Sequence, residues 1–152
     1  MNTKSYLRID GVEGDSLAAG HLGDIDIVLY SWGSPTFADE TMPRLSSGSP
    51  TNGVGVINVT KSPDKASYAL NKAAVSGDHF SSMLLIVDRD PYGYVPFMIY
   101  EMIDVIVFSL RTDQISGGTT VFEQVIFKFN SSNAIFQPAP APPSSTDGWT
   151  IR

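Results

Sequence analysis

The sequence of 152 residues predicts one mainly β domain with a single α-helix. Two patterns predict this class. Most apolar residues fall in runs of β-branched and aromatic side chains that end at Gly, Pro, Asn, Asp or Ser, as strands do. Only one stretch, shortly before Gly77, has apolar residues at helical spacing. A chain of this length can bury a core without disulfides or metal ions, and it contains no cysteine.

The first predicted strand contains Tyr6, Leu7 and Ile9 and ends at turn residues. A polar connection follows, and we expect its His21 to be solvated. Residues 25–33 are predicted as one continuous strand, the spine of the fold. Apolar side chains occupy both of its faces, which is unusual for an antiparallel strand with a solvated side, so we expect it to be covered on both faces.

A long segment, residues 34–53, contains three prolines and little periodicity. Loops of this length in compact domains are usually functional or disordered. Residues 54–60 then alternate in polarity and predict another strand.

Residues 63–76 predict the helix. Ser62 can cap it with Pro63 at the first helical position, or Asp64 can serve as the cap. Gly77 supplies a left-handed stop. The apolar stripe is made of small residues, so the helix can lie close to a sheet; its members are Ala66, Ala69, Leu70 and Ala73.

The C-terminal half is strongly β. Residues 95–110 predict two strands or one bent strand, with a kink within residues 101–104. The other predicted strands are residues 83–89, 121–129 and 133–137. Residues 138–152 form a Pro-rich spacer that ends in Trp149 and Ile151, a composition that predicts a tail docking on its own domain or on a neighbour.

Composition and charge exclude several classes of function. The net charge is −6 and Lys and Arg do not cluster, which argues against nucleic acid and anionic membranes as partners. The N-terminus has no apolar signal-peptide core and no run reaches transmembrane length, so we expect neither a cleaved signal nor membrane insertion. Charged residues make up 17% of the chain, below the roughly 25% of average domains, which favours a surface that partners cover.

The sequence does not predict an enzyme, a cofactor or a metal site, because none of the usual catalytic or phosphate-binding motifs is present. Asp24 and Asp26 resemble paired carboxylates, and Asp78 with His79 resembles a base and its orienting group. However, both aspartates flank a strand start, where polar residues usually serve turns. His79 follows a helix end, where its charge favours the helix dipole.

Four segments, in this order and spacing, resemble the haemolysin-coregulated protein (Hcp) family, the tube proteins of the bacterial type VI secretion system. They are Asp24-Ile-Asp-Ile-Val-Leu-Tyr-Ser-Trp-Gly33, the helix start Asp64-Lys65-Ala66-Ser67 with the exit Ser76-Gly77-Asp78-His79-Phe80, the strand Phe122-Glu-Gln-Val-Ile-Phe-Lys-Phe129, and the terminal Gly148-Trp149-Thr150-Ile151-Arg152.

The resemblance implies a small β-barrel of two antiparallel sheets with one flanking helix over residues 1–137, assembled into a hexameric ring. Rings would stack into a tube that is expelled with a spike at its tip, from inside a contractile sheath, and that carries small effectors in its lumen. The protein would begin in the bacterial cytoplasm and be secreted to the extracellular space or a target cell.

Within that framework, the sequence assigns candidate roles to several residues. One face of the spine would bury in the barrel and the other would contact the helix or a neighbouring subunit. Ser31 is the candidate for the lumen wall. The spine residues are Ile25, Ile27, Val28, Tyr30 and Trp32, and the candidates for ring stacking in the long loop are Phe37, Met42 and Leu45.

Two other interpretations of the sequence are open. A monomeric β-sandwich binding module would use Trp32, Tyr92 and Tyr94 as a stacking platform for sugars or peptides. A tail-tube protein of a phage or another contractile particle would use the same kinds of ring and stacking contacts as the secretion tube.

Overall fold

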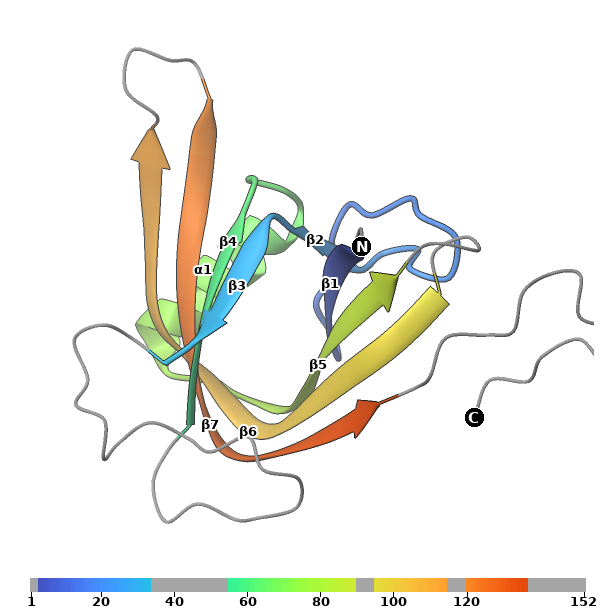
Figure 1. Ribbon diagram of the computed structural model, residues 1–152. Coiled ribbons are helices and arrows are strands. Elements are labelled where there is room, and N and C mark those ends of the chain that lie inside the picture. The colour runs from blue at the N-terminus through green and yellow to red at the C-terminus, as the bar shows by residue number, and fades with distance from the viewer. Residues whose placement is uncertain (1–2, 34–54, 90–94, 115–119, 137–152) are drawn as a thin grey trace, which may run out of the picture.

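The computed structural model describes residues 3–33, 55–89, 95–114 and 120–136. Seven antiparallel strands form one sheet in the order β2-β1-β5-β6-β7-β4-β3, and the sheet curls into a nearly closed barrel (Figure 1). The strands are β1 (Thr3–Ile9), β2 (Ile25–Ile27), β3 (Leu29–Trp32), β4 (Gly55–Lys61), β5 (His79–Arg89), β6 (Val95–Gln114) and β7 (Val121–Phe136). The one helix of the described residues, α1 (Ala66–Ser76), packs on the barrel.

The two sheets that the resemblance implied are the two halves of this one sheet, because β6 and β7 run through both halves and bend between them (Figure 1). The kink expected within residues 101–104 is confirmed. Asp104 lies at the bend with φ 59°, a left-handed conformation that is uncommon for residues other than glycine. His79 and Asn130, from the strands on either side, both hydrogen-bond its carboxylate. The β6–β7 register is kept across Asp104 and shifts farther along, between Val107 and Ser109.

The prediction of one continuous strand over residues 25–33 was wrong. The chain leaves β2, which pairs with β1, and enters β3, which pairs with β4, by a bend at Val28. The bend reverses which side chains point inward. Ile25 and Ile27 are buried, but Leu29 is 57% exposed, and Tyr30 and Trp32 pack against the core in its place. The apolar residues on both faces of the predicted strand therefore reflect two short strands at the two ends of one sheet.

The helix is confirmed, although it begins at Ala66, three residues later than predicted. The predicted caps were wrong, because Lys65 is at the N-cap position and its side chain makes no capping bond, while Ser62 and Pro63 lie before the helix. The Ala66 N–H donates to Asp64 Oδ1 at 3.0 Å. Gly77 ends the helix in the left-handed conformation, with φ 77°, as predicted. Ala66, Leu70 and Ala73 are buried against the core, so the stripe of small residues lets the helix approach the barrel closely.

The barrel interior holds one continuous apolar core. Side chains from α1 and from every strand except β3 fill it. Tyr30 and Trp32 of β3 pack at its margin. Its largest buried apolar members are Phe127, Phe129, Leu7, Ile25, Ile57, Leu70, Met83, Leu85 and Met102. The C-terminal strand predictions were too short, because residues 121–129 and 133–136 belong to one strand and β5 already begins at His79.

Candidate assembly surfaces

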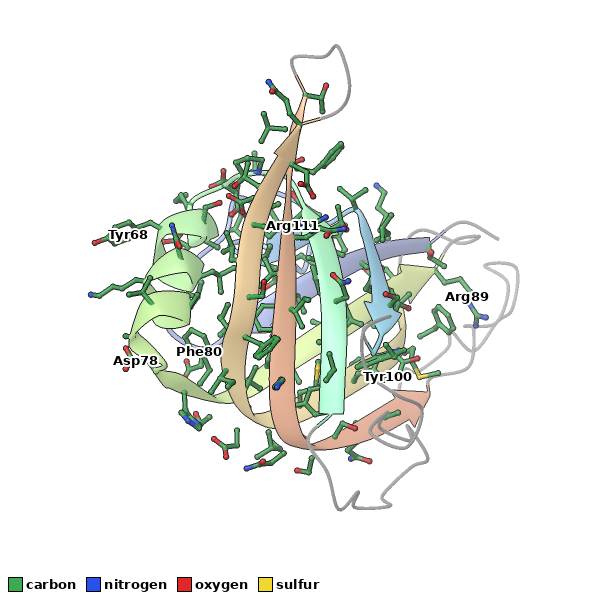
Figure 2. The ribbon with its side chains drawn as sticks, turned by 90° about the vertical axis from the view of Figure 1, so that its left-hand side faces the viewer. Tyr68, Asp78, Phe80, Arg89, Tyr100 and Arg111 are labelled. Carbon is green, nitrogen blue, oxygen red and sulfur yellow. The ribbon has the colours of Figure 1, made fainter. Side chains whose placement is uncertain are left out.

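The half of the sheet formed by β3, β4, β7 and the second half of β6 has one face in the core and one face turned outward (Figure 2). The residues that face each other across strands share a side, so Ser31, Asn58, Ile126 and Ser109 form one outward row. Ser31 is exposed, and α1 lies beside this face without covering it. Ser31 is thus accessible, as a wall residue would need to be.

Phe108 lies in the register shift of β6, where it is 49% exposed. The Lys128 ammonium lies 3.8 Å from the centroid of its ring, which is cation–π distance. Arg111, farther along β6, pairs with Asp113 at 3.1 Å. The outward face therefore mixes small polar, apolar and basic side chains.

The same half-sheet has two different free edges in the described residues. β3 pairs only with β4, and residues 107–114 of β6 pair only with β7, because the last β5–β6 pair joins His79 to Ile106. α1 packs against β6 beside part of this edge, and the β6–β7 hairpin extends past the helix (Figure 2). Unpaired edges of this kind are templates for pairing with another chain.

The spine residues do not form one surface. Ile25 and Ile27 are in the core, and Val28 is at the exposed bend. Tyr30 and Trp32 are half-buried, and the Trp32 ring meets Tyr100 and Phe129 edge-on at 5.0 and 6.2 Å. Trp32 is therefore packed against other rings and is not an open stacking platform. Burial, and then the charge of Tyr100, raise the pKa of Tyr30, and burial also raises that of Tyr100.

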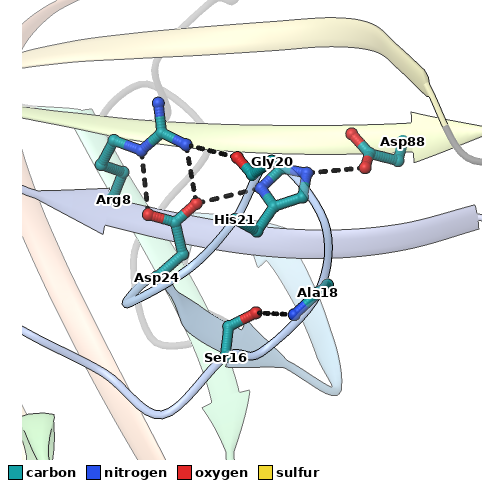
Figure 3. Close-up of polar contacts among 7 residues, drawn as sticks. All are labelled: Arg8, Ser16, Ala18, Gly20, His21, Asp24 and Asp88. Carbon is teal, nitrogen blue, oxygen red and sulfur yellow. Dashed lines mark hydrogen bonds and ion pairs between the residues drawn. The ribbon is translucent and has the colours of Figure 1, made fainter.

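His21 is buried, so the prediction that it is solvated was wrong. Its ring stacks on Tyr6 at 3.8 Å, and its two nitrogens lie 2.9 Å from Asp24 Oδ2 and 2.6 Å from Asp88 Oδ2 (Figure 3). Arg8 donates two hydrogen bonds of 2.9 Å to the same Asp24 carboxylate, and these bonds raise the Arg8 pKa. This network, which we call the His21 cluster, fastens the connection between β1 and β2 onto β1 and β5. No local pattern indicates this cluster, because Asp88 lies 67 positions from His21.

Lys61 is completely buried, with its ammonium 2.7 Å from Glu123 Oε1, 2.9 Å from Asp64 Oδ1 and 3.2 Å from Ser67 Oγ. These four residues, the Lys61 cluster, connect β4 and β7 to the start of α1. A signal was present, because Lys61 and Glu123 each stand in phase with the buried residues of their strands and pair in register. Asp64, Ser67 and Glu123 also lie within the segments that carried the family resemblance.

The candidate acid–base pairs do not form a catalytic site. Asp24 does end a turn, because its backbone N–H donates to the His21 carbonyl at 2.9 Å, and its side chain is engaged in the His21 cluster. Asp26 is exposed. His79 Nδ1 lies 2.6 Å from Asp104 Oδ1 on the surface, and its partner is not Asp78. In the described ranges, no group of three His, Cys, Asp or Glu side chains is placed to hold a metal ion.

The remaining candidates lie outside the described residues. They are Phe37, Met42, Leu45, Tyr92, Tyr94, Trp149 and Ile151. Within the described part of the chain, none of the helical structure is long and apolar enough to cross a membrane.

Three comparisons with known proteins bear on this geometry. Residues 6–134 match the family model described as type VI secretion system effector, Hcp. Hcp1 from Salmonella typhimurium is similar in structure, with a TM-score of 0.70, 19% identity and coverage of 89% of this chain and 88% of that one. No curated protein matches by sequence.

Two further solved structures extend the likeness. A type six secretion system protein gives a TM-score of 0.72 at 26% identity, over 90% of this chain and 85% of its own. The secreted protein Hcp3 from Pseudomonas aeruginosa gives 0.62 at 16% identity, over 91% of this chain and all of its own. The family match spans most of the sequence, and these three structures are similar to this fold over 89–91% of this chain. The chain therefore belongs to the Hcp family of the type VI secretion system, whose members are structural tube proteins and not enzymes.

Proposed function

We propose that this protein forms hexameric rings that stack into the inner tube of the secretion system. The observation that carries the proposal is the pair of unlike free edges on one half-sheet. A ring needs a heterologous interface in which one patch meets a different patch on the next copy. β3 of one copy can pair, within residues 107–114 of β6 in the next copy, with the part that extends past α1, and repetition around an axis closes the ring. The other half-sheet ends in β2, which is only three residues long.

The same pairing determines whether the outward face of this half-sheet points toward the lumen or toward the exterior of the ring. Half-sheets joined edge to edge form a closed wall, and the rest of each barrel lies behind it. A cylinder has more room outside than inside, so the bulk formed by β1, β2, β5 and α1 belongs on the outer side. The face that carries Ser31 then lines the lumen, where effector proteins would contact it.

The long loop has the composition for ring stacking. Phe37, Met42 and Leu45 are apolar residues in a polar segment. Burying one such side chain in an adjoining ring contributes on the order of 1.5–3 kcal/mol. Three of them therefore contribute several kcal/mol at most, before the cost of ordering the loop is subtracted. Six copies per ring multiply this weak contact. Trp149 and Ile151 are proposed to dock in the assembly, because they are apolar residues at the end of a Pro-rich polar spacer.

Sheath, spike and effectors are the proposed partners of the assembled tube, and passage from the bacterial cytoplasm to the exterior is the proposed route. A tail tube of another contractile particle is the second candidate. It is favoured by the likeness to the cap of the anti-feeding prophage, with a TM-score of 0.52 at 11% identity over 87% of each chain. Genes for a secretion sheath or for a particle, found beside this one, separate the two candidates.

Negative-stain electron microscopy of the purified protein tests the proposal. We expect rings with six-fold symmetry, and end-to-end tubes at high protein concentration. A monodisperse monomer at all concentrations would contradict the proposal.

A further inference from the structure

We propose that the exposed stripe of α1 binds a partner helix that has an apolar seam and acidic residues beside it. The inference rests on the proposed function only in placing α1 on the outer surface of the ring. The stripe itself is a feature of the single chain, and it stands on the opposite side of the helix from the buried residues Ala66, Leu70 and Ala73.

The exposure of this stripe is extreme for apolar side chains. Tyr68 is 77% exposed and Val75 is 85% exposed, and both line a shallow, open groove of about 370 Å³ together with Asn71, Lys72 and Ser76. Figure 2 shows the Tyr68 side chain pointing away from the barrel. Single exposed apolar residues are ordinary, but two that line one groove on one helix form a candidate contact surface.

The spacing of the stripe indicates that the partner is a helix. Tyr68, Asn71 and Val75 follow one another by three and then four residues, the spacing of a coiled-coil seam. Lys65 and Lys72 are seven residues apart, so both lie on the same flank of that seam. Residues at this flank position form interhelical ion pairs and select the partner.

The charge of the stripe indicates an acidic partner. Residues 65–77 contain two lysines and no Asp or Glu, although the whole chain has 16 acidic and 10 basic residues. Lys65 makes one long contact of 3.5 Å with exposed Glu13, and Lys72 makes no ion pair in the described part of the chain. A partner with Glu or Asp beside its apolar seam would therefore complement this flank.

A pair of synthetic peptides tests the proposal on the full-length protein. Both are amphipathic helices with leucine at three-four spacing, and they carry either glutamate or lysine on both flanks. Fluorescence anisotropy in low salt measures their binding. We expect the glutamate peptide to bind at least 10-fold more tightly, Lys72→Glu to reverse the preference, and Val75→Ser to weaken binding of the glutamate peptide about 10-fold.

Lys128→Glu is the matched control, because it makes the same charge change on the outward sheet face. Equal binding of both peptides, or the same shift from Lys72→Glu and Lys128→Glu, would overturn the proposal. A lower mass of the Val75→Ser assembly would also overturn it, since a second copy would then occupy the stripe. The mass of each sample in solution is measured in parallel, so loss of peptide binding by an intact ring is distinguished from failure of ring formation.

Discussion

Replacement of Lys61 by methionine tests how the strands and the helix are held together. Methionine fills much of the same space but removes the ammonium that lies 2.7 Å from Glu123 and 2.9 Å from Asp64. Both carboxylates have side chains only 8% exposed, so each would lose its cation in a nearly dry site. Breaking a buried ion pair from one side typically costs about 3–5 kcal/mol.

Chemical unfolding followed by circular dichroism measures this loss, at one protein concentration for all variants because assembly adds to apparent stability. For a chain of this size, the loss corresponds to a melting temperature lower by about 6–20 °C. Lys65→Met is the matched control: its contact with Glu13 is 3.5 Å long and both side chains are more than 60% exposed. That variant should change stability by about 0–1 kcal/mol.

A second variant separates charge burial from packing. The double substitution Lys61→Met with Glu123→Leu removes both the cation and its closest carboxylate, and we expect it to recover more than half of the loss. A cost below about 1 kcal/mol for Lys61→Met alone, or no recovery in the double variant, would refute this reasoning about the Lys61 cluster.

Three further predictions concern other parts of the chain. His21→Ala should lower the free energy of unfolding in urea by about 2–4 kcal/mol, because Asp24 and Asp88 lose a buried partner. His79→Ala, on the surface, should lower it by less than about 1 kcal/mol. Equal losses would contradict the structural role assigned to the His21 cluster. The raised pKa of Tyr30 means that the unfolded chain releases this phenolic proton first, so stability should fall as the pH rises above about 10. Between pH 8 and pH 10.5, the free energy of unfolding of the Tyr30→Phe variant should fall less than that of the wild type. An equal fall in the two proteins would count against burial of Tyr30 as the cause of the pH dependence. Deletion of residues 36–49 should leave rings intact and abolish their stacking, and normal tubes in electron micrographs would defeat the proposed role of the loop.

Much of the fold could be predicted because local signals agreed with the final structure. The helix, its glycine stop and the alternating strand of residues 121–129 each follow from short-range periodicity. The kink within residues 101–104 was also found, although the reason was not visible: Asp104 is held in a left-handed conformation by bonds from two neighbouring strands. These features depend on residues that are close in sequence or in register.

The predictions failed where long-range pairing decides the structure. Residues 25–33 look like one strand because β2 and β3 are both strands, and only their different partners, β1 and β4, require the bend at Val28. The burial of His21 depends on Asp88, which no local pattern relates to it. Lys61 and Glu123 could have been paired from sequence, since each interrupts the buried side of a strand, and two opposite charges in such positions predict a buried ion pair.

The edge-to-edge ring is the central claim, and the mass in solution of two lysine variants tests it most directly. Leu29→Lys places a charge on the free edge of β3, where a neighbouring strand would pair, and charged side chains on edge strands oppose such pairing. Val75→Lys makes a comparable change at a site that is also exposed but lies on α1.

Light scattering after size exclusion should give the wild type and Val75→Lys a mass of about 98 kDa, six times the 16.4 kDa of one chain. It should give Leu29→Lys the mass of a folded monomer. A monomeric wild type, or a Leu29→Lys variant that remains as hexameric as Val75→Lys, would contradict the assembly proposed here.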